Sequence, residues 1–179
     1  VNISRYDLFR ESLVDVISSL VRKYDIPARL LRLEITESAF AKSTAKVISV
    51  VKSLVSGGFT IEIDDFGSGY SSLNTLKDVP AQIVKLDMRF LESGDNSKRG
   101  GSILESVVRM TKWLGMDVIA EGVEERAQAD FLKSIGCTCL QGYYYARPMP
   151  VPEYEAIAAG DTRRPRPEPV KPVSCLDNH

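Results

Sequence analysis

The chain has 179 residues, of which 44% are hydrophobic, and this composition supports one globular domain with a sizeable core. Its 23 basic and 24 acidic residues give a net charge of −1, so there is no general attraction to a nucleic acid polymer or to an anionic membrane surface. The one histidine, His179, is the last residue, which excludes a Ser-His-Asp triad and a histidine-rich metal site and leaves oxygen ligands for any catalytic metal, favouring magnesium or manganese.

Short strands alternate with amphipathic helices along the chain. Apolar residues at helical spacing predict a helix over residues 6–24, with Ser4 as its N-cap and Asp7 completing a capping box. The further elements expected, in chain order, are a strand at 30–36, a helix at 43–56, strands at 59–64 and 82–87, a helix at about 101–114, a strand at 117–121, a helix at about 125–135 and a last strand at about 138–142. This repetition indicates an α/β fold with a parallel sheet and crossover helices.

The composition changes near the end of the chain. Residues 160–179 are rich in proline and arginine and cannot bury a core, so we expect a domain over 1–159 followed by an extended linker or tail. Three cysteines, Cys137, Cys139 and Cys175, are too few and too scattered for a disulfide framework. No apolar run is long enough to span a bilayer, and we expect a cytoplasmic domain.

Polar side chains share one face of each expected strand, mostly late in the strand. Glu34, Asp64, Lys85 and Glu121 lie on such faces, and Asp65 follows Asp64 directly. Four carboxylates and a lysine at the ends of four strands carry too much charge for a core without a counter-ion, and divalent cations would supply it. Neighbouring aspartates can reach two adjacent ions, the arrangement used for in-line phosphoryl displacement. By contrast, Arg32 and Glu62 are expected to form an ordinary ion pair.

Several runs of residues carry a family likeness. In order and spacing they resemble the signatures of the EAL-domain cyclic di-GMP phosphodiesterases, and the likeness covers about residues 1–158. The runs are Asn2-Ile3-Ser4, Glu34-Ile35-Thr36-Glu37-Ser38, Asp64-Asp65-Phe66-Gly67-Ser68-Gly69-Tyr70-Ser71-Ser72-Leu73, Lys85-Leu86-Asp87, Glu121-Gly122-Val123-Glu124, Gln141-Gly142-Tyr143-Tyr144 and Arg147-Pro148-Met149-Pro150.

The resemblance implies a TIM-like (β/α) barrel that hydrolyses cyclic di-GMP to the linear dinucleotide with two Mg²⁺ or Mn²⁺ ions. By the same resemblance, Lys85 would orient or activate the attacking water, and a lysine beside two metal ions is expected to titrate low enough to accept a proton. Glu121 would bind metal or assist the base, Gln141 would position a water or the ligand, and Glu37 would brace the loop 66–72. The implied metal-site residues are Asn2, Glu34, Asp64, Asp65 and Asp87.

One departure from the family concerns the Glu-Ala-Leu tripeptide, which is absent. The resemblance places it before residue 1, and a complete barrel needs about 250 residues. We therefore expect a barrel that is incomplete at the N-terminus, and weak or no activity from this chain by itself, because the missing glutamate would be a metal ligand.

Two other functions remain open at this point. A non-catalytic receptor for cyclic di-GMP, or a protein-interaction module, would use the same fold, although the carboxylates that degenerate members lose are present here. A barrel with lysine and acids at its strand ends could also abstract a proton beside a carboxylate, as enolase-type enzymes do. The expected partners are cyclic di-GMP, a second copy of the chain, and sensor or GGDEF domains in the full protein, with no nucleic acid polymer, no direct membrane contact by this segment, and any membrane anchoring left to other domains.

Overall fold

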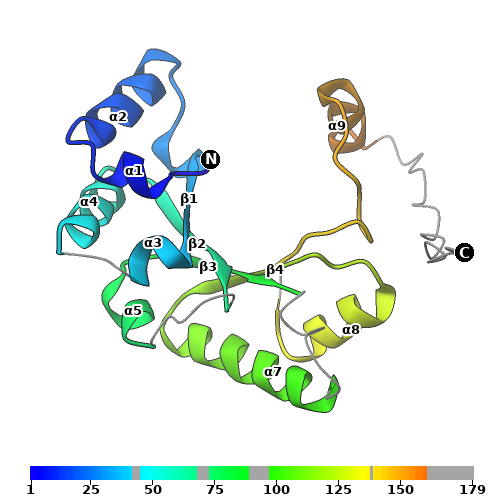
Figure 1. Cartoon of the computed structure of the whole chain (residues 1–179). Helices are drawn as coiled ribbons and strands as arrows, with labels where there is room; N and C mark the ends of the chain where they lie inside the picture. The colour runs from blue at the N-terminus through cyan, green and yellow to red at the C-terminus, as the bar shows by residue number, and fades with distance from the viewer. Residues whose placement is uncertain (42–44, 68–72, 89–96, 138, 161–179) are drawn as a thin grey trace, which may run out of the picture.

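The computed structural model describes residues 1–41, 45–67, 73–88, 97–137 and 139–160 (Figure 1). Helices and strands alternate through this part of the chain. In chain order the elements are α1 (Arg5–Leu8), α2 (Leu13–Lys23), the 3₁₀ helix η1 (Ala28–Leu30), β1 (Arg32–Thr36), α3 (Glu37–Ala41), α4 (Ala45–Ser56), β2 (Thr60–Phe66), α5 (Leu73–Asp78), β3 (Ile83–Asp87), α7 (Ser97–Trp113), β4 (Asp117–Glu121), α8 (Arg126–Ser134), β5 (Cys139–Leu140) and α9 (Val151–Ala158).

The five strands form one parallel sheet in the order β1-β2-β3-β4-β5, so strands that are consecutive in the chain are neighbours in the sheet. Helix α4 packs against β2 and α7 packs against β4. Figure 1 shows α7 and α8 on one side of the sheet, whereas α9 stands apart from it. The predicted α/β class with a parallel sheet is confirmed.

The two faces of the sheet differ in chemistry. The face toward the helices is lined by buried aliphatic side chains that belong to the main core: Leu33, Ile35, Ile61, Ile63, Val84, Leu86, Val118 and Ala120. Burial of one leucine or isoleucine side chain contributes about 1.5–3 kcal/mol, so this face fixes the register of β1, β2, β3 and β4. The alternation of a strand then places the ionisable residues on the opposite face.

The expected helix at 6–24 is divided into α1 and α2 by residues 9–12. Leu8 and Leu13 are both buried in the core, but five residues of a continuous helix would point them about 140° apart. The break lets both side chains face the core. The predicted capping box is confirmed, because the Ser4 hydroxyl accepts from the Asp7 N–H and the Asp7 carboxylate accepts from the Ser4 N–H.

Other differences lie at the ends of strands. The expected strand at 30–36 begins at Arg32, since residues 28–30 form η1 after Pro27. The last strand is reduced to Cys139–Leu140, because the chain turns after Gln141 with the Tyr145 N–H bonded to the Gly142 carbonyl; position 138 lies outside the described residues. Helix α9, which the pattern did not indicate, contains no buried residue.

Residues 161–179 also lie outside the described part of the chain, so the proposed tail stays a prediction. Within the described residues, no helix has the length and apolarity needed to cross a bilayer.

Candidate active site

One lysine holds three carboxylates at the end of the sheet. The Nζ of Lys85 on β3 lies 2.5 Å from Glu34 Oε2 on β1, 3.1 Å from Asp64 Oδ1 on β2 and 2.9 Å from Glu121 Oε1 on β4. The lysine side chain is 9% exposed, and those of the acids are 15–23% exposed. We call these four residues the Lys85 cluster.

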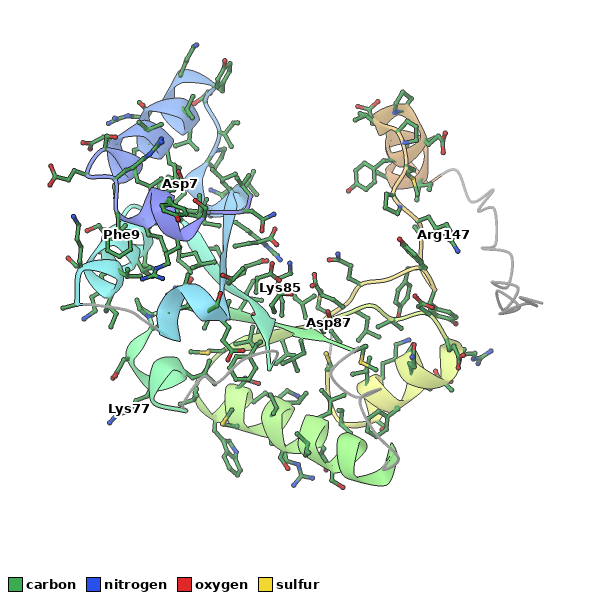
Figure 2. The ribbon with its side chains drawn as sticks, viewed as in Figure 1. Asp7, Phe9, Lys77, Lys85, Asp87 and Arg147 are labelled. Carbon is green, nitrogen blue, oxygen red and sulfur yellow. The ribbon has the colours of Figure 1, made fainter. Side chains whose placement is uncertain are left out.

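Strand register explains why the cluster forms. Lys85 and Asp87 lie on one face of β3, and Asp87 pairs with Glu121 across β3 and β4. Thr36, two residues after Glu34 on the same face of β1, pairs with Asp64 across β1 and β2. In parallel strands the carboxyl ends meet at one edge, which is where side chains for catalysis gather in parallel barrels. Figure 2 labels Lys85 and Asp87, which lie two residues apart on β3.

The charges within the cluster affect one another strongly. Burial alone would lower the pKa of Lys85, but its hydrogen bonds to Glu34, Glu121 and Asp64 raise that pKa above the ordinary value. Burial raises and Lys85 lowers the pKa of Glu34, with a net lowering, whereas burial dominates at Glu121 and raises its pKa. In this arrangement Lys85 is an ammonium, and the lower pKa expected for a lysine beside two metal ions stays a prediction.

A bulge redirects the chain at the predicted aspartate pair. The pairing of β2 with β3 shifts between Ile63 and Phe66, and Asp65 has a positive φ of 54°. In a regular strand the alternation would turn Asp65 toward the helices. The bulge leaves Asp65 exposed instead, while Asp64 faces Lys85 and accepts the Asp65 N–H at 3.0 Å. Bulges commonly re-aim side chains beside active sites.

Asn2 and Asp87 reach the cluster through backbone pairing. Asn2 forms an isolated parallel bridge with Glu34, and Asp87 is the sheet partner of Glu121. The Met88 N–H donates to the Glu121 carbonyl at 3.0 Å, which fixes the end of β3 against the end of β4.

Glu37 and Gln141 occupy the rim of the same edge. Glu37 is only 3% exposed, and its Oε2 accepts the Gly67 N–H at 2.6 Å. Residues 68–72, the remainder of the loop that Glu37 is predicted to brace, lie outside the described residues. The Gln141 side chain is exposed, and the Gln141 backbone bonds to Ala120 and Val123.

Two further features concern structural roles. The expected ion pair between Arg32 and Glu62 is confirmed at 3.0 Å, with Glu62 buried.

Sequence reasoning did not assign a role to Gly142. A Cβ there would lie 2.2 Å from the Val123 carbonyl oxygen, so a glycine is required for the close approach of these two backbones. The sequence offered one signal for this close approach, a glycine directly after the polar residue Gln141 at the end of a predicted strand.

The donor set suits a hard divalent cation. Every ionisable ligand candidate is a carboxylate, and such oxygen sites prefer Mg²⁺ or Mn²⁺. Across the described residues, no three histidine, cysteine or acidic side chains are already arranged to hold a metal ion. The Lys85 ammonium lies among the acids and supplies positive charge there. The residues fit a metal, with the carboxylates gathered and oriented by the lysine.

A parallel sheet with acids and a lysine at the carboxyl ends of its strands defines the class of (β/α)-barrel enzymes that work at this edge. A family model described as "EAL domain" matches residues 1–148, and the chain belongs to the EAL domain family.

Among similar proteins, the signaling protein YkoW of Bacillus subtilis is 37% identical over 87% of this chain and 19% of its own length. The bifunctional diguanylate cyclase/cyclic di-GMP phosphodiesterase MucR of Pseudomonas aeruginosa is 35% identical over 89% of this chain and 23% of its own length. The chain thus spans about a fifth of these two relatives.

Solved structures agree with the family. The MucR phosphodiesterase in complex with cyclic di-GMP has a TM-score of 0.79 and 34% identity, over 86% of this chain and 68% of that one. The EAL domain of Mycobacterium smegmatis DcpA has a TM-score of 0.81 and 28% identity, over 88% and 71%. The Klebsiella pneumoniae BlrP1 complex with manganese and cyclic di-GMP has a TM-score of 0.73 and 28% identity, over 80% and 37%. The five-stranded sheet corresponds to part of the TIM-like barrel of this family.

Proposed function

We propose that this EAL domain hydrolyses one phosphodiester bond of cyclic di-GMP and releases the linear dinucleotide. The observation that carries the proposal is the convergence of Glu34, Asp64 and Glu121 on Lys85 at the carboxyl ends of four strands. Similar proteins of the same family are named cyclic di-GMP phosphodiesterases, among them RocR, which is 33% identical over 89% of this chain.

The net negative charge of the Lys85 cluster means that cations are needed before an anionic substrate can bind there. Three carboxylates surround one ammonium, so an anionic phosphate would meet net negative charge. We assign two Mg²⁺ or Mn²⁺ ions to Glu34, Asp64, Asp65 and Glu121, supported by Asn2 and Asp87. Once bound, such ions neutralise phosphate oxygens and lower the pKa of a bound water.

The protein groups position the reactants. The Lys85 ammonium has three N–H donors in a fixed place, and in this proposal it donates to the attacking water and orients it toward phosphorus. Gln141 holds a water or the ligand at the rim. Glu37 fixes the backbone at Gly67, where the segment after β2 leaves the sheet.

The cellular location and the partners of the domain are a further part of the proposal. We infer that the domain works inside a larger signalling protein with sensor or cyclase domains, as a homodimer in the cytoplasm. The names of relatives such as the oxygen sensor protein DosP of Escherichia coli support the first point. Free thiols at Cys137 and Cys139 fit a reducing compartment.

The test is chromatographic detection of the linear dinucleotide made by the full-length protein with Mn²⁺ or Mg²⁺. We expect turnover that EDTA abolishes and that Asp64→Asn lowers by about 100-fold or more, because it removes a metal ligand. The matched control is Asp15→Asn, at an exposed acid on α2 outside the cluster, which should retain full activity.

The chain of residues 1–179 is assayed in parallel, and we expect it to be the weaker enzyme, since the matched EAL-domain structures extend beyond it. Tight binding of cyclic di-GMP by the full-length protein without any turnover would replace the proposal with a receptor function.

A further inference from the structure

A cavity of about 430 Å³ lies at the end of the sheet opposite to the Lys85 cluster. Its walls come from the last turns of α2, from the segment that leads into β1 and from the segment that leads into β2. In Figure 1 the segment from α2 enters β1 at the end opposite to α3. The cavity therefore lies at the amino ends of strands whose carboxyl ends carry the proposed active site. Pockets of about 300–1,000 Å³ hold small molecules.

The walls of the cavity combine apolar surface with two opposite charges. Val21 and Phe59 are buried, and Ile26 is 45% exposed, so much of its side chain is uncovered. Arg22 and Asp25 also line the cavity, and both residues are exposed. Among the described residues, neither of these two side chains forms an ion pair. The cavity thus offers one cation and one anion beside an apolar wall.

Asp25 occupies a backbone position at which glycine is usual. The Ile26 N–H donates to the Val21 carbonyl at 2.9 Å, and the Asp25 N–H donates to the carbonyl of residue 22 at 3.3 Å, so α2 ends in a Schellman motif. Asp25 has a positive φ of 51°. Helices α4, α7 and α8 end with the same two bonds, and the residue of positive φ is in each case a glycine: Gly58, Gly115 and Gly136.

This difference between the helix ends singles out the cavity. A side chain at positive φ costs conformational free energy that glycine does not. Of the four positions, only residue 25 lines the cavity. The helix end that carries a side chain at this costly position is therefore the one that places a carboxylate at the cavity wall.

The chemistry of the walls suits a small zwitterion with an apolar substituent. The ammonium group of such a ligand would pair with Asp25. Its carboxylate would pair with Arg22, because a guanidinium can donate two parallel hydrogen bonds to a carboxylate. We propose that the cavity binds an apolar α-amino acid, with the substituent against Val21, Ile26 and Phe59. This second site does not depend on the proposed hydrolysis of cyclic di-GMP.

The experiment is equilibrium dialysis of the full-length protein against radiolabelled L-leucine, without metal and without cyclic di-GMP. We expect saturable binding at a single site in each chain, with a Kd below about 1 mM. Two competitors keep the branched chain of leucine but lack one charged group: 4-methylpentanoate lacks the ammonium and 3-methylbutylamine lacks the carboxylate. Each should bind about tenfold or more weakly than leucine, because one charge of the cavity is left unmatched.

Asp25→Gly separates binding from stability. Glycine relieves the cost of the positive φ, so the thermal midpoint should rise, whereas affinity for leucine should fall by about tenfold or more. Arg22→Gln should lose affinity to a similar degree without a change in the thermal midpoint. The matched controls are Asp15→Asn and Arg29→Gln, at exposed residues outside the cavity, and both should bind leucine like the unchanged protein.

Two results would overturn the inference. One is the absence of saturable leucine binding at about 1 mM. The other is unchanged affinity in Asp25→Gly, since the carboxylate would then take no part in binding. Hydrolysis of cyclic di-GMP is measured in a separate assay, so either proposal can fail while the other stands.

Discussion

At the scale of single residues, the site depends on how one ammonium balances three acids. Glu34, Asp64 and Glu121 come from three different strands, and each lies within 3.1 Å of Lys85 Nζ. Carboxylates this close repel one another when no cation lies between them. Lys85 therefore holds the acids together at one end of the sheet, where we propose that divalent ions bind.

Replacing Lys85 with methionine should reveal this role. The change leaves the acids without a counter-ion, so without metal the free energy of unfolding should fall by about 3 kcal/mol, the lower end for a broken buried pair because the acids are partly exposed. Lys85 lowers the pKa values of Glu34 and Glu121, so its loss raises both in the folded state, and stability should then increase as the pH falls from about 8 to about 5. Urea titrations at both pH values measure the effect.

Two additions make the Lys85→Met test specific. Millimolar Mn²⁺ should recover much of the lost stability, because bound cations replace the ammonium. The control Lys133→Met, at an exposed lysine on α8, should be neutral under all conditions. If Lys85→Met were as stable as the unchanged protein at neutral pH without metal, the balance described for the cluster would be incorrect.

Glu37 provides a second test at this scale. Glu37→Ala leaves the Gly67 N–H without its acceptor, so the free energy of unfolding should fall by about 1–3 kcal/mol, and Glu37→Gln should lose less because its amide oxygen still accepts. Hydrogen exchange at the Gly67 amide should accelerate in the alanine variant and change little in the glutamine variant. Equal exchange rates in all three proteins would show that Glu37 does not protect the Gly67 amide.

At the scale of elements, alternation in the strands predicted most of what positions the site. The strand 117–121 has the predicted bounds, and 82–87 differs by one residue. Alternation also placed Glu34, Asp64, Lys85 and Glu121 on one face. Local pattern did not reveal the break at residues 9–12, because helical spacing alone does not show that Leu8 and Leu13 face the same core.

The end of β5 depends on a contact that is distant in the sequence. Gly142 touches the backbone of Val123, and Gly142→Ala would place a methyl group 2.2 Å from the Val123 carbonyl oxygen. We expect a loss of about 1–3 kcal/mol in the free energy of unfolding and lower activity, because Gln141 would shift.

Gly115→Ala is the control for Gly142→Ala. Its methyl would meet no atom within 4 Å, and only the positive φ of 72° opposes it. This variant should lose about 1 kcal/mol and retain activity. Denaturant unfolding and turnover of both variants check the comparison, and full activity in Gly142→Ala would contradict the importance of the close approach.

At the scale of the whole molecule, the register of four strands, β1 to β4, brings residues 34, 64, 85 and 121 into contact. Alternation along each strand predicted which residues share a face. It could not predict that Glu34, Asp64 and Glu121 all contact Lys85, because those contacts depend on how β1, β2, β3 and β4 are aligned with one another. The bulge at Asp65 was likewise not predicted, since consecutive aspartates look alike in a regular strand. The family match over residues 1–148 places this sheet within the EAL barrel.

The central claim is that the Lys85 cluster supports hydrolysis of cyclic di-GMP by holding divalent cations. The most direct measurement is a Mn²⁺ titration of the full-length protein, with bound Mn²⁺ followed by electron paramagnetic resonance and cyclic di-GMP turnover followed in the same samples. Turnover should rise in proportion to bound Mn²⁺, and Asp64→Asn should lose both together. Undiminished turnover in Asp64→Asn, or turnover with no bound metal, would contradict the account.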